Sequence, residues 1–243
     1  MVFKLNKFLI LLVYFLASLY LQSEESLVVK NEYKPVVNEI IEILDQNHFK
    51  KNIVINEQKV IDNFLVNIDK EKIVFTSVEF NSYKARFKNI YNLEEIFKIY
   101  QDYSDRTLEL INYQKDVVDL IDTSADLNTT EFVEKSREDE KRFNSLDSIK
   151  NYHALLIKNE FINILLSNDN FENSKSKLLK RLKNRVKSLK RIKSDDIFSL
   201  YINSITSLYD PHTNYLSPKS QEDFEINMSL SLEGIGAILS TED

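Results

Sequence analysis

Cysteine and tryptophan are absent from this 243-residue sequence, and glycine and proline are scarce, with two and three residues respectively. Without cysteine the chain has no disulfide, no thiolate nucleophile and no cysteine-ligated metal site. No glycine or proline occurs from Val36 to Asp210, a span of 175 residues in which average usage would place about 21. Because these two residues interrupt helices, their absence predicts a long helical body.

Apolar side chains recur at spacings of three and four along this span, as they do on the buried face of a helix. Pro35 suits the first turn of the first helix. Thr76 and Glu79 form a capping-box pattern for the third, and Ser194 is expected to cap the last. The expected apolar faces are Val36–Leu44, Val60–Ile68, Phe80–Ile90, Leu93–Ile121 and Ile197–Leu208, with further helices at 147–167 and 171–193. Residues 122–146 are polar and aperiodic, which predicts a loop, so the expected fold class is an all-α, irregular multi-helix domain.

The N-terminus has the pattern of a signal peptide. Lys4 and Lys7 precede an apolar run of 14 residues, from Phe8 to Leu21. As a helix this run would be about 21 Å long, which is shorter than the roughly 30 Å hydrocarbon core of a membrane. We therefore expect residues 1–23 to be a signal peptide that exports the chain to the periplasm. Cleavage after Ser23 and retention as an uncleaved anchor both remain open.

A basic run lies within an acidic protein. The formal net charge is −6, yet residues 175–193 hold ten Lys and Arg and no acid, interleaved with leucines at helical spacing. The favoured interpretation is a core-facing apolar stripe with long basic side chains around it. The alternative is contact with an anionic inner-membrane surface. The acidic balance of an exported chain argues against a nucleic-acid partner.

Candidate catalytic and metal-binding residues are few. His48, His153 and His212 are each more than 50 residues apart, so no pair has the spacing of two ligands on one helical face. His212 and Ser217 are close in sequence, but no third residue orients them as a base and a nucleophile. The sequence therefore predicts no metal site, no cofactor and no catalytic residue.

The C-terminal part differs in composition from the helical body. Asp-Pro-His-Thr-Asn at 210–214 has turn chemistry, and Ser217-Pro218 suits the start of a short helix through Phe224. Gly234, Ile235, Gly236 and Ala237 form a Gly–aliphatic–Gly loop, whose backbone N–H groups can converge on a terminal carboxylate. Alone this pattern is weak, because a hairpin turn can also carry two glycines.

Together, Asp-Pro-His-Thr-Asn-Tyr-Leu-Ser-Pro at 210–218, Phe224 and Met-Ser-Leu-Ser-Leu-Glu-Gly-Ile-Gly-Ala-Ile-Leu at 228–239 resemble the tail-specific proteases. These form a periplasmic, PDZ-containing branch of the C-terminal-processing serine peptidases. Asn47-His-Phe and the stretches beginning at Arg181 and Ser194 resemble the helical N-terminal domain of the same branch.

The resemblance implies a domain order and a division of roles. Residues 24–209 would be the helical N-terminal domain, 210–227 a linker turn with a short helix, and 228–243 the truncated first strand of a PDZ-like β domain. Gly234, Ile235, Gly236 and Ala237 would belong to the loop that binds the C-termini of polypeptide substrates, which in this family are apolar. No Ser or Lys here matches the family's catalytic dyad, which would lie beyond Asp243, so we expect the chain alone to be inactive. The alternative is a free-standing periplasmic helical scaffold or binding module without enzymatic activity.

Overall fold

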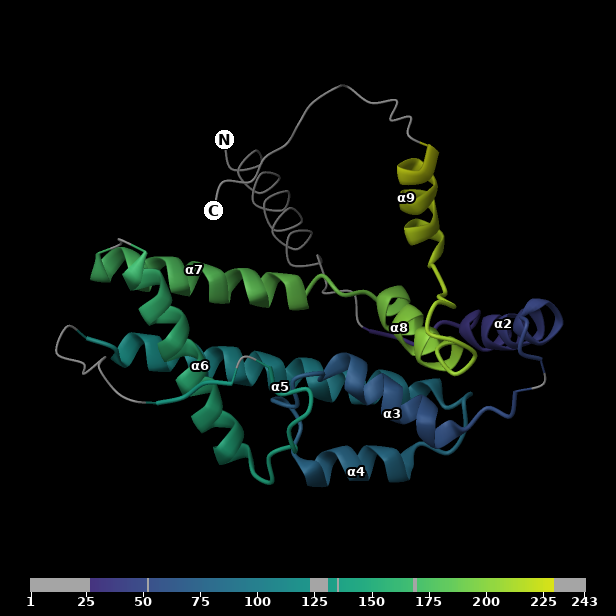
Figure 1. The fold of residues 1–243 in the computed structure, drawn as a ribbon, viewed down its shortest axis with the longest axis horizontal. Helices are drawn as coiled ribbons and strands as arrows, with labels where there is room; N and C mark the ends of the chain where they lie inside the picture. The colour runs from purple at the N-terminus through teal and green to yellow at the C-terminus, as the bar shows by residue number, and fades with distance from the viewer. Residues whose placement is uncertain (1–26, 52, 123–130, 135, 168–169, 230–243) are drawn as a thin grey trace, which may run out of the picture.

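The computed structural model describes residues 27–51, 53–122, 131–134, 136–167 and 170–229. Within these ranges all regular secondary structure is helical and there is no strand, which confirms the all-α fold class (Figure 1). The helices are α2 (Tyr33–Asn47), α3 (Glu57–Ile68), α4 (Ser77–Arg86), α5 (Leu93–Leu120), α6 (Leu146–Leu166), α7 (Phe171–Leu189), α8 (Ser194–Thr206) and α9 (Pro218–Ser229).

Helix α5 forms the axis of the domain. Its 28 residues span about 42 Å, long enough to serve two separate groups of helices. Helices α6 and α7 pack on its C-terminal half (Figure 1). Helix α8 contacts its N-terminal half, and α3 and α4 belong to the same hydrophobic cluster. The fold is therefore an irregular bundle with two hydrophobic clusters along one long helix.

The larger cluster joins α2, α3, α4, α8 and the first half of α5, and it also includes Leu110 of α5 and Ile149 of α6. The predicted stripe of α3 is buried throughout: Val60, Ile61, Phe64, Leu65 and Ile68. At its centre the Tyr201 ring meets Phe64 edge to face, and the Tyr201 hydroxyl donates to the Ile90 carbonyl at 2.5 Å. Burying a large apolar side chain contributes about 1.5–3 kcal/mol, so this stripe accounts for much of the cohesion of the cluster.

The smaller cluster accounts for the leucines that are interleaved with the basic run of α7. Leu178 and Leu182 of α7 are fully buried against Ile157 and Phe161 of α6 and against Val118 of α5. The interpretation of this leucine stripe as core-facing is therefore confirmed.

Helix starts were predicted in part. Thr76 and Glu79 form the expected capping box: the Glu79 N–H donates to Thr76 Oγ1, and the Thr76 N–H donates to the Glu79 carboxylate. The prediction that Ser194 caps α8 is wrong. Lys193 holds the cap position, and Ser194 is already helical. The hydroxyl of Ser194 instead accepts the backbone N–H of Val28 at 3.0 Å, a contact between segments 166 residues apart.

Two other boundaries differ from expectation. Helix α4 ends at Arg86, so Phe87 and Ile90 pack in the core from the following turn rather than from the helix itself. Helix α9 starts at Pro218, as Ser217-Pro218 predicted, and continues to Ser229 rather than ending at Phe224. The Ser220 N–H donates to Ser217 Oγ at 3.2 Å, which is the expected N-cap bond.

Several predictions fall outside the described residues. These are the signal peptide at 1–23, most of the PDZ-like strand, and the loop of Gly234, Ile235, Gly236 and Ala237. Among the helices that the structure does describe, none is both long and apolar enough to cross a bilayer.

Candidate functional site

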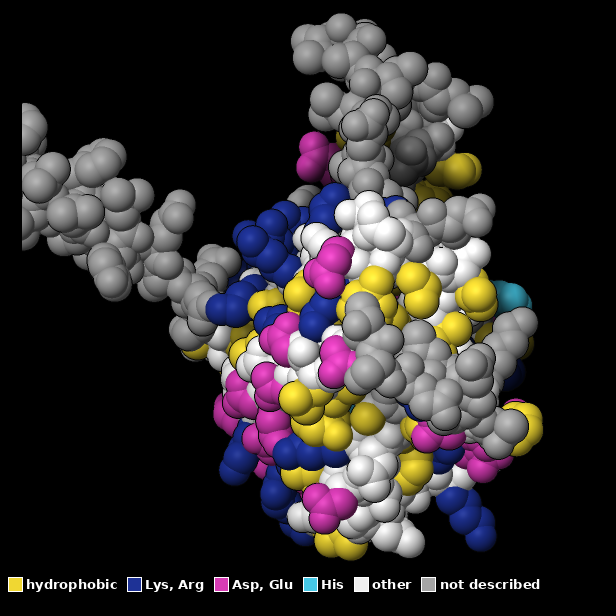
Figure 2. All heavy atoms as spheres, turned by 90° about the vertical axis from the view of Figure 1, so that its left-hand side faces the viewer, with side chains coloured by type: hydrophobic (Ala, Val, Ile, Leu, Met, Phe, Trp, Pro, Cys, Tyr) yellow, Lys and Arg dark blue, Asp and Glu magenta, His cyan; other side chains and the backbone are white. Residues whose placement is uncertain are grey.

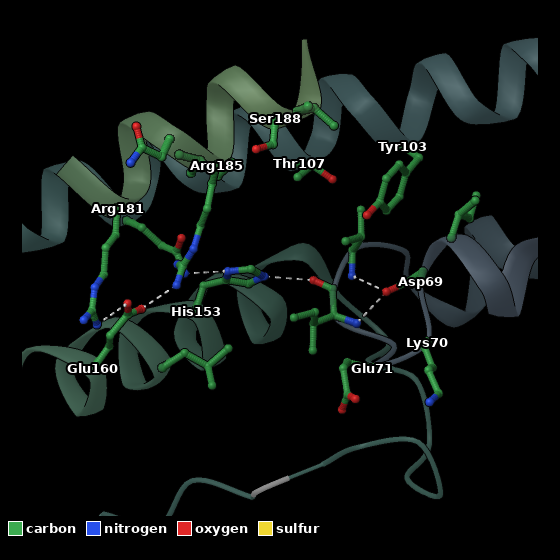
Figure 3. Close-up of a pocket in the computed structure, with 18 of the residues that line it drawn as sticks. Asp69, Lys70, Glu71, Tyr103, Thr107, His153, Glu160, Arg181, Arg185 and Ser188 are labelled. Carbon is green, nitrogen blue, oxygen red and sulfur yellow. Dashed lines mark hydrogen bonds and ion pairs between the residues drawn. The ribbon is translucent and has the colours of Figure 1, made fainter. Parts of the chain in front are cut away.

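An open groove of about 1100 Å³ lies in the described part of the molecule. It lies between the C-terminal half of α7, the middle of α5 and α6, and the turn that follows α3 (Figure 3). Its apolar lining comes mainly from Ile73, Val74, Tyr100, Tyr103, Ile111, Leu156, Leu189 and Ile192, and its polar lining includes Asn67, Asn159, Asn163 and Asn184. A concave surface that combines apolar side chains with several amide groups suits the binding of a ligand.

The turn over residues 69–75 forms one wall of this groove and is organised by a buried carboxylate. Asp69 accepts backbone N–H groups from Ile73 at 2.9 Å, Val74 at 3.2 Å and Phe75 at 3.1 Å. The guanidinium of Arg142 also donates to the Asp69 carboxylate, and both side chains are almost fully buried. Asp69 thus neutralises a buried cation and satisfies three backbone donors, which fixes the shape of the wall.

His153 of α6 connects that wall to the centre of the groove. Its Nδ1 accepts a hydrogen bond from the side-chain amide of Gln114 at 3.1 Å, and its Nε2 lies 3.0 Å from the Ile73 carbonyl oxygen (Figure 3). These two bonds together select the neutral ring with its proton on Nε2. Burial lowers the pKa of His153, which also favours the neutral form. Because both ring nitrogens already form hydrogen bonds, His153 has a structural role rather than that of a metal ligand or a general base.

A second polar cluster lies on the side of the groove formed by α7. Glu160 of α6 accepts from Arg185 at 2.7 Å and from Arg181 at 3.4 Å (Figure 3). Lys175, near the start of α7, donates to the carbonyls of Asp119 and Ile121 at the end of α5, both at 3.0 Å. Lys175, Arg181 and Arg185 of the basic run therefore hold α7 against its neighbours.

Two of the segments that carry the family resemblance meet in space. His48 follows α2, and its Nε2 lies 2.7 Å from Asp210 Oδ2, although 162 residues separate them. Thr213 donates its hydroxyl to the same carboxylate oxygen, and the His212 N–H donates to Asp210 Oδ1 at 2.7 Å. These hydrogen bonds, first that of Thr213 and then that of His48, hold the pKa of Asp210 well below its ordinary value. We call His48, Asp210 and Thr213 the linker clamp.

Further bonds attach the linker to α8. The side chain of Asn203 accepts the Tyr215 N–H at 2.6 Å and donates to the Tyr215 carbonyl at 3.2 Å. Thr206 donates its hydroxyl to the Thr213 carbonyl at 2.7 Å. Residues 210–215 are therefore fastened to the helical body at both ends, immediately before α9 leaves it (Figure 1).

The candidate pair His212 and Ser217 is not assembled as a catalytic unit. His212 is exposed, and Ser217 shares a hydrogen bond with Ser220 at the start of α9. In the described ranges no group of three or more carboxylates and histidines is placed to hold a metal ion. The predicted carboxylate-binding residues Gly234, Ile235, Gly236 and Ala237 lie beyond the described residues.

Sequence reasoning missed the groove, the Asp69 turn and the contact of His48 with Asp210. Each brings together residues from different helices, and no local pattern announces such a pairing. The one available signal was the resemblance, which marked the 47–49 and 210–218 segments separately without placing them next to each other.

Comparison with known proteins matches residues 40–219 to a family described as the tail specific protease N-terminal domain. The chain is also 29% identical over 209 residues to a protein of Haemophilus influenzae named tail-specific protease. That alignment covers 82% of this chain and 30% of the relative, so this chain spans less than a third of the relative's length.

Proposed function

Because the chain belongs to the tail-specific protease N-terminal domain family, we propose that it is the helical N-terminal domain of a periplasmic serine endopeptidase. The proposed substrates are proteins with apolar C-termini. One observation carries the proposal: the family match spans residues 40–219, which include helices α3 to α8, every residue of the linker clamp and the start of α9.

The proposed task of this domain is to hold the linker, and with it the start of the next domain, in one direction. The support is structural: the linker is bonded to α8 through Asn203 and Thr206 and to the end of α2 through His48. A recognition loop at Gly234–Ala237 follows α9 closely in sequence. In such an arrangement the rigid helical domain, rather than the loop itself, determines where the bound C-terminus of a substrate is positioned.

The helical domain itself has no peptidase centre in this proposal. Hydrolysis by the route that the resemblance implies needs a serine nucleophile, a neutral lysine as base and an oxyanion site. Buried serines in the described residues have other tasks: Ser174 and Ser204 donate to carbonyls of residues 170 and 200. No serine or lysine of the sequence matches the family's dyad.

A peptidase assay tests this part of the proposal. The purified chain is incubated with an unfolded substrate that has an apolar C-terminus, and the expected rate equals that of buffer alone. Turnover that co-purifies with the chain and disappears when one of its own serines is replaced by alanine would contradict the proposal.

The proposed location rests on the basic and apolar N-terminus. Lys4, Lys7 and the run from Phe8 to Leu21 fit an export signal, and fractionation of a tagged copy should recover the protein in the periplasm or on the outer face of the inner membrane. Recovery wholly in the cytoplasm at normal expression would contradict export.

The second candidate function is a free-standing periplasmic binding module, and the open groove beside α7 is the observation that favours it. The two candidates differ in what the gene encodes next. Continuation of the reading frame after codon 243 into PDZ and protease sequence supports the protease domain, whereas a terminator with an otherwise intact gene supports the binding module.

A further inference from the structure

One side of α7 carries a row of cations directed away from the protein core. Lys180, Lys183 and Lys187 are exposed, and exposed Arg191 follows just after the helix, so the four are spaced three to four residues apart. No ion pair or hydrogen bond is recorded for these four side chains within the described part of the chain. We call these four residues the basic stripe. On a helix such spacing places side chains along one face, opposite to buried Leu178 and Leu182.

Positive charge is concentrated along α7. The chain as a whole has a formal net charge of −6, whereas residues 175–193 contain ten cations and no acid, so the acidic excess lies elsewhere. Figure 2 shows Lys and Arg side chains gathered at the upper left of one face, at the height that α7 occupies in Figure 1. Because salt screens charges beyond about 8–10 Å, a flat anionic surface that touches this edge is attracted by the stripe and feels the distant acids only weakly.

The N-terminal segment enters the helical body beside the end of the basic stripe. The Val28 N–H donates to Ser194 Oγ at 3.0 Å, and Lys30 and Tyr33 bind the Asp195 carboxylate at 2.7 and 2.6 Å. Ser194 and Asp195 begin α8, three and four residues after Arg191. Residues 28–33, which follow the predicted export segment in sequence, therefore pack within a few residues of the end of the stripe.

We propose that the basic stripe of α7 binds the headgroups of anionic phospholipids, on the side of the body where the chain enters from the N-terminus. The proposal rests on the proposed export to the periplasm, where the outer face of the inner membrane offers such lipids. The apolar face of α7 is occupied by the protein core, so the helix binds through charge and does not insert. The attraction of each exposed Lys or Arg to an anionic lipid surface adds to that of the others, so a row of four binds more strongly than the same cations scattered over the protein.

Sedimentation with lipid vesicles tests the proposal on the full chain. One set of vesicles contains phosphatidylethanolamine and phosphatidylglycerol, and the other contains phosphatidylcholine alone. The stripe variant combines Lys180→Gln, Lys183→Gln, Lys187→Gln and Arg191→Gln, because glutamine keeps helix propensity and removes charge. The matched control removes four exposed cations elsewhere, in Lys51→Gln, Lys59→Gln, Lys98→Gln and Lys141→Gln.

The stripe variant should lose at least about tenfold in partitioning onto the anionic vesicles, and the control should stay close to the unmodified chain. Raising the salt concentration should abolish the difference, and on phosphatidylcholine all three proteins should bind alike. Equal losses in the two variants, or binding that ignores phosphatidylglycerol, would overturn the proposal, as would a stronger preference of the stripe for double-stranded DNA than for the anionic vesicles. Export and peptidase activity are measured separately, so failure of the proposed function is distinguishable from failure of the stripe.

Discussion

Replacement of Asp69 by alanine is expected to be among the most destabilising single changes in the domain. The carboxylate accepts three backbone N–H groups and pairs with the Arg142 guanidinium, and Asp69 is 3% exposed. Removing one partner of a buried ion pair costs about 3–5 kcal/mol, because the remaining charge stays buried without compensation. The three backbone donors add to this cost unless water reaches them.

Urea unfolding of the purified chain measures this cost. Single domains have a free energy of unfolding of about 5–15 kcal/mol, so the Asp69→Ala variant should unfold at a much lower urea concentration or be only partly folded in buffer. Asp69→Asn keeps one acceptor oxygen for the backbone N–H groups but also leaves the Arg142 charge without its partner, so it should still cost about 3–5 kcal/mol, somewhat less than Asp69→Ala. Asp139→Ala, which removes an exposed carboxylate from the neighbouring loop, is the matched control and should change little.

Two further readouts separate the ion pair from a general loss of packing. The double variant Asp69→Ala with Arg142→Ala should cost less than the sum of the single variants, because the second change removes the uncompensated charge. Hydrogen exchange should accelerate first at the N–H groups of Ile73, Val74 and Phe75, which Asp69 accepts. If Asp69→Ala matches Asp139→Ala within about 0.5 kcal/mol, the assignment of Asp69 as the organiser of the groove wall is refuted.

Four smaller perturbations follow from the same structure. Thr76→Ala removes the cap of α4 and should cost about 0.5–2 kcal/mol in urea unfolding, whereas an unchanged midpoint would contradict the capping box. Leu182→Ala opens a cavity in the smaller cluster and should cost about 2–5 kcal/mol, and a loss below 1 kcal/mol would show that α7 is not packed there. Burial lowers the pKa of His153, so as the pH falls the unfolded chain binds the proton before the folded chain does, and the free energy of unfolding should decrease below about pH 6.5. His153→Gln should flatten that part of the curve of unfolding free energy against pH. An unaltered curve would refute the buried neutral ring. Asp210→Ala breaks the linker clamp and should speed proteolytic cleavage within residues 210–217, while unchanged cleavage would show that the clamp does not hold the linker.

Helix positions were predictable because they depend on local patterns. Thr76 and Glu79 are three residues apart, and the stripe from Val60 to Ile68 repeats within one helix, so each could be identified without knowing what packs against it. The absence of glycine and proline between Val36 and Asp210 predicted the helical body for the same reason.

Contacts between residues far apart in the sequence determine the features that the sequence did not predict or predicted wrongly. Ser194 fits an N-cap by type and position, but its hydroxyl accepts the N–H of Val28 from a distant segment. Asp69 lies at the end of α3, where a polar residue suggests a solvated turn, and only the fold brings buried Arg142 to it. His48 and Asp210 are likewise unremarkable in sequence and meet through the packing of the helices between them.

A chimera tests most directly the central claim that this chain is the N-terminal domain of a tail-specific protease. Residues 40–219 replace the aligned region of the Haemophilus influenzae protein, and cleavage of an unfolded substrate with an apolar C-terminus is measured. The account predicts that the chimera cleaves this substrate and that adding Asp210→Ala, which frees the linker, lowers the rate without a matching loss of helical content. A chimera that unfolds cooperatively, with the helical content of its parent, yet cleaves nothing would contradict the claim.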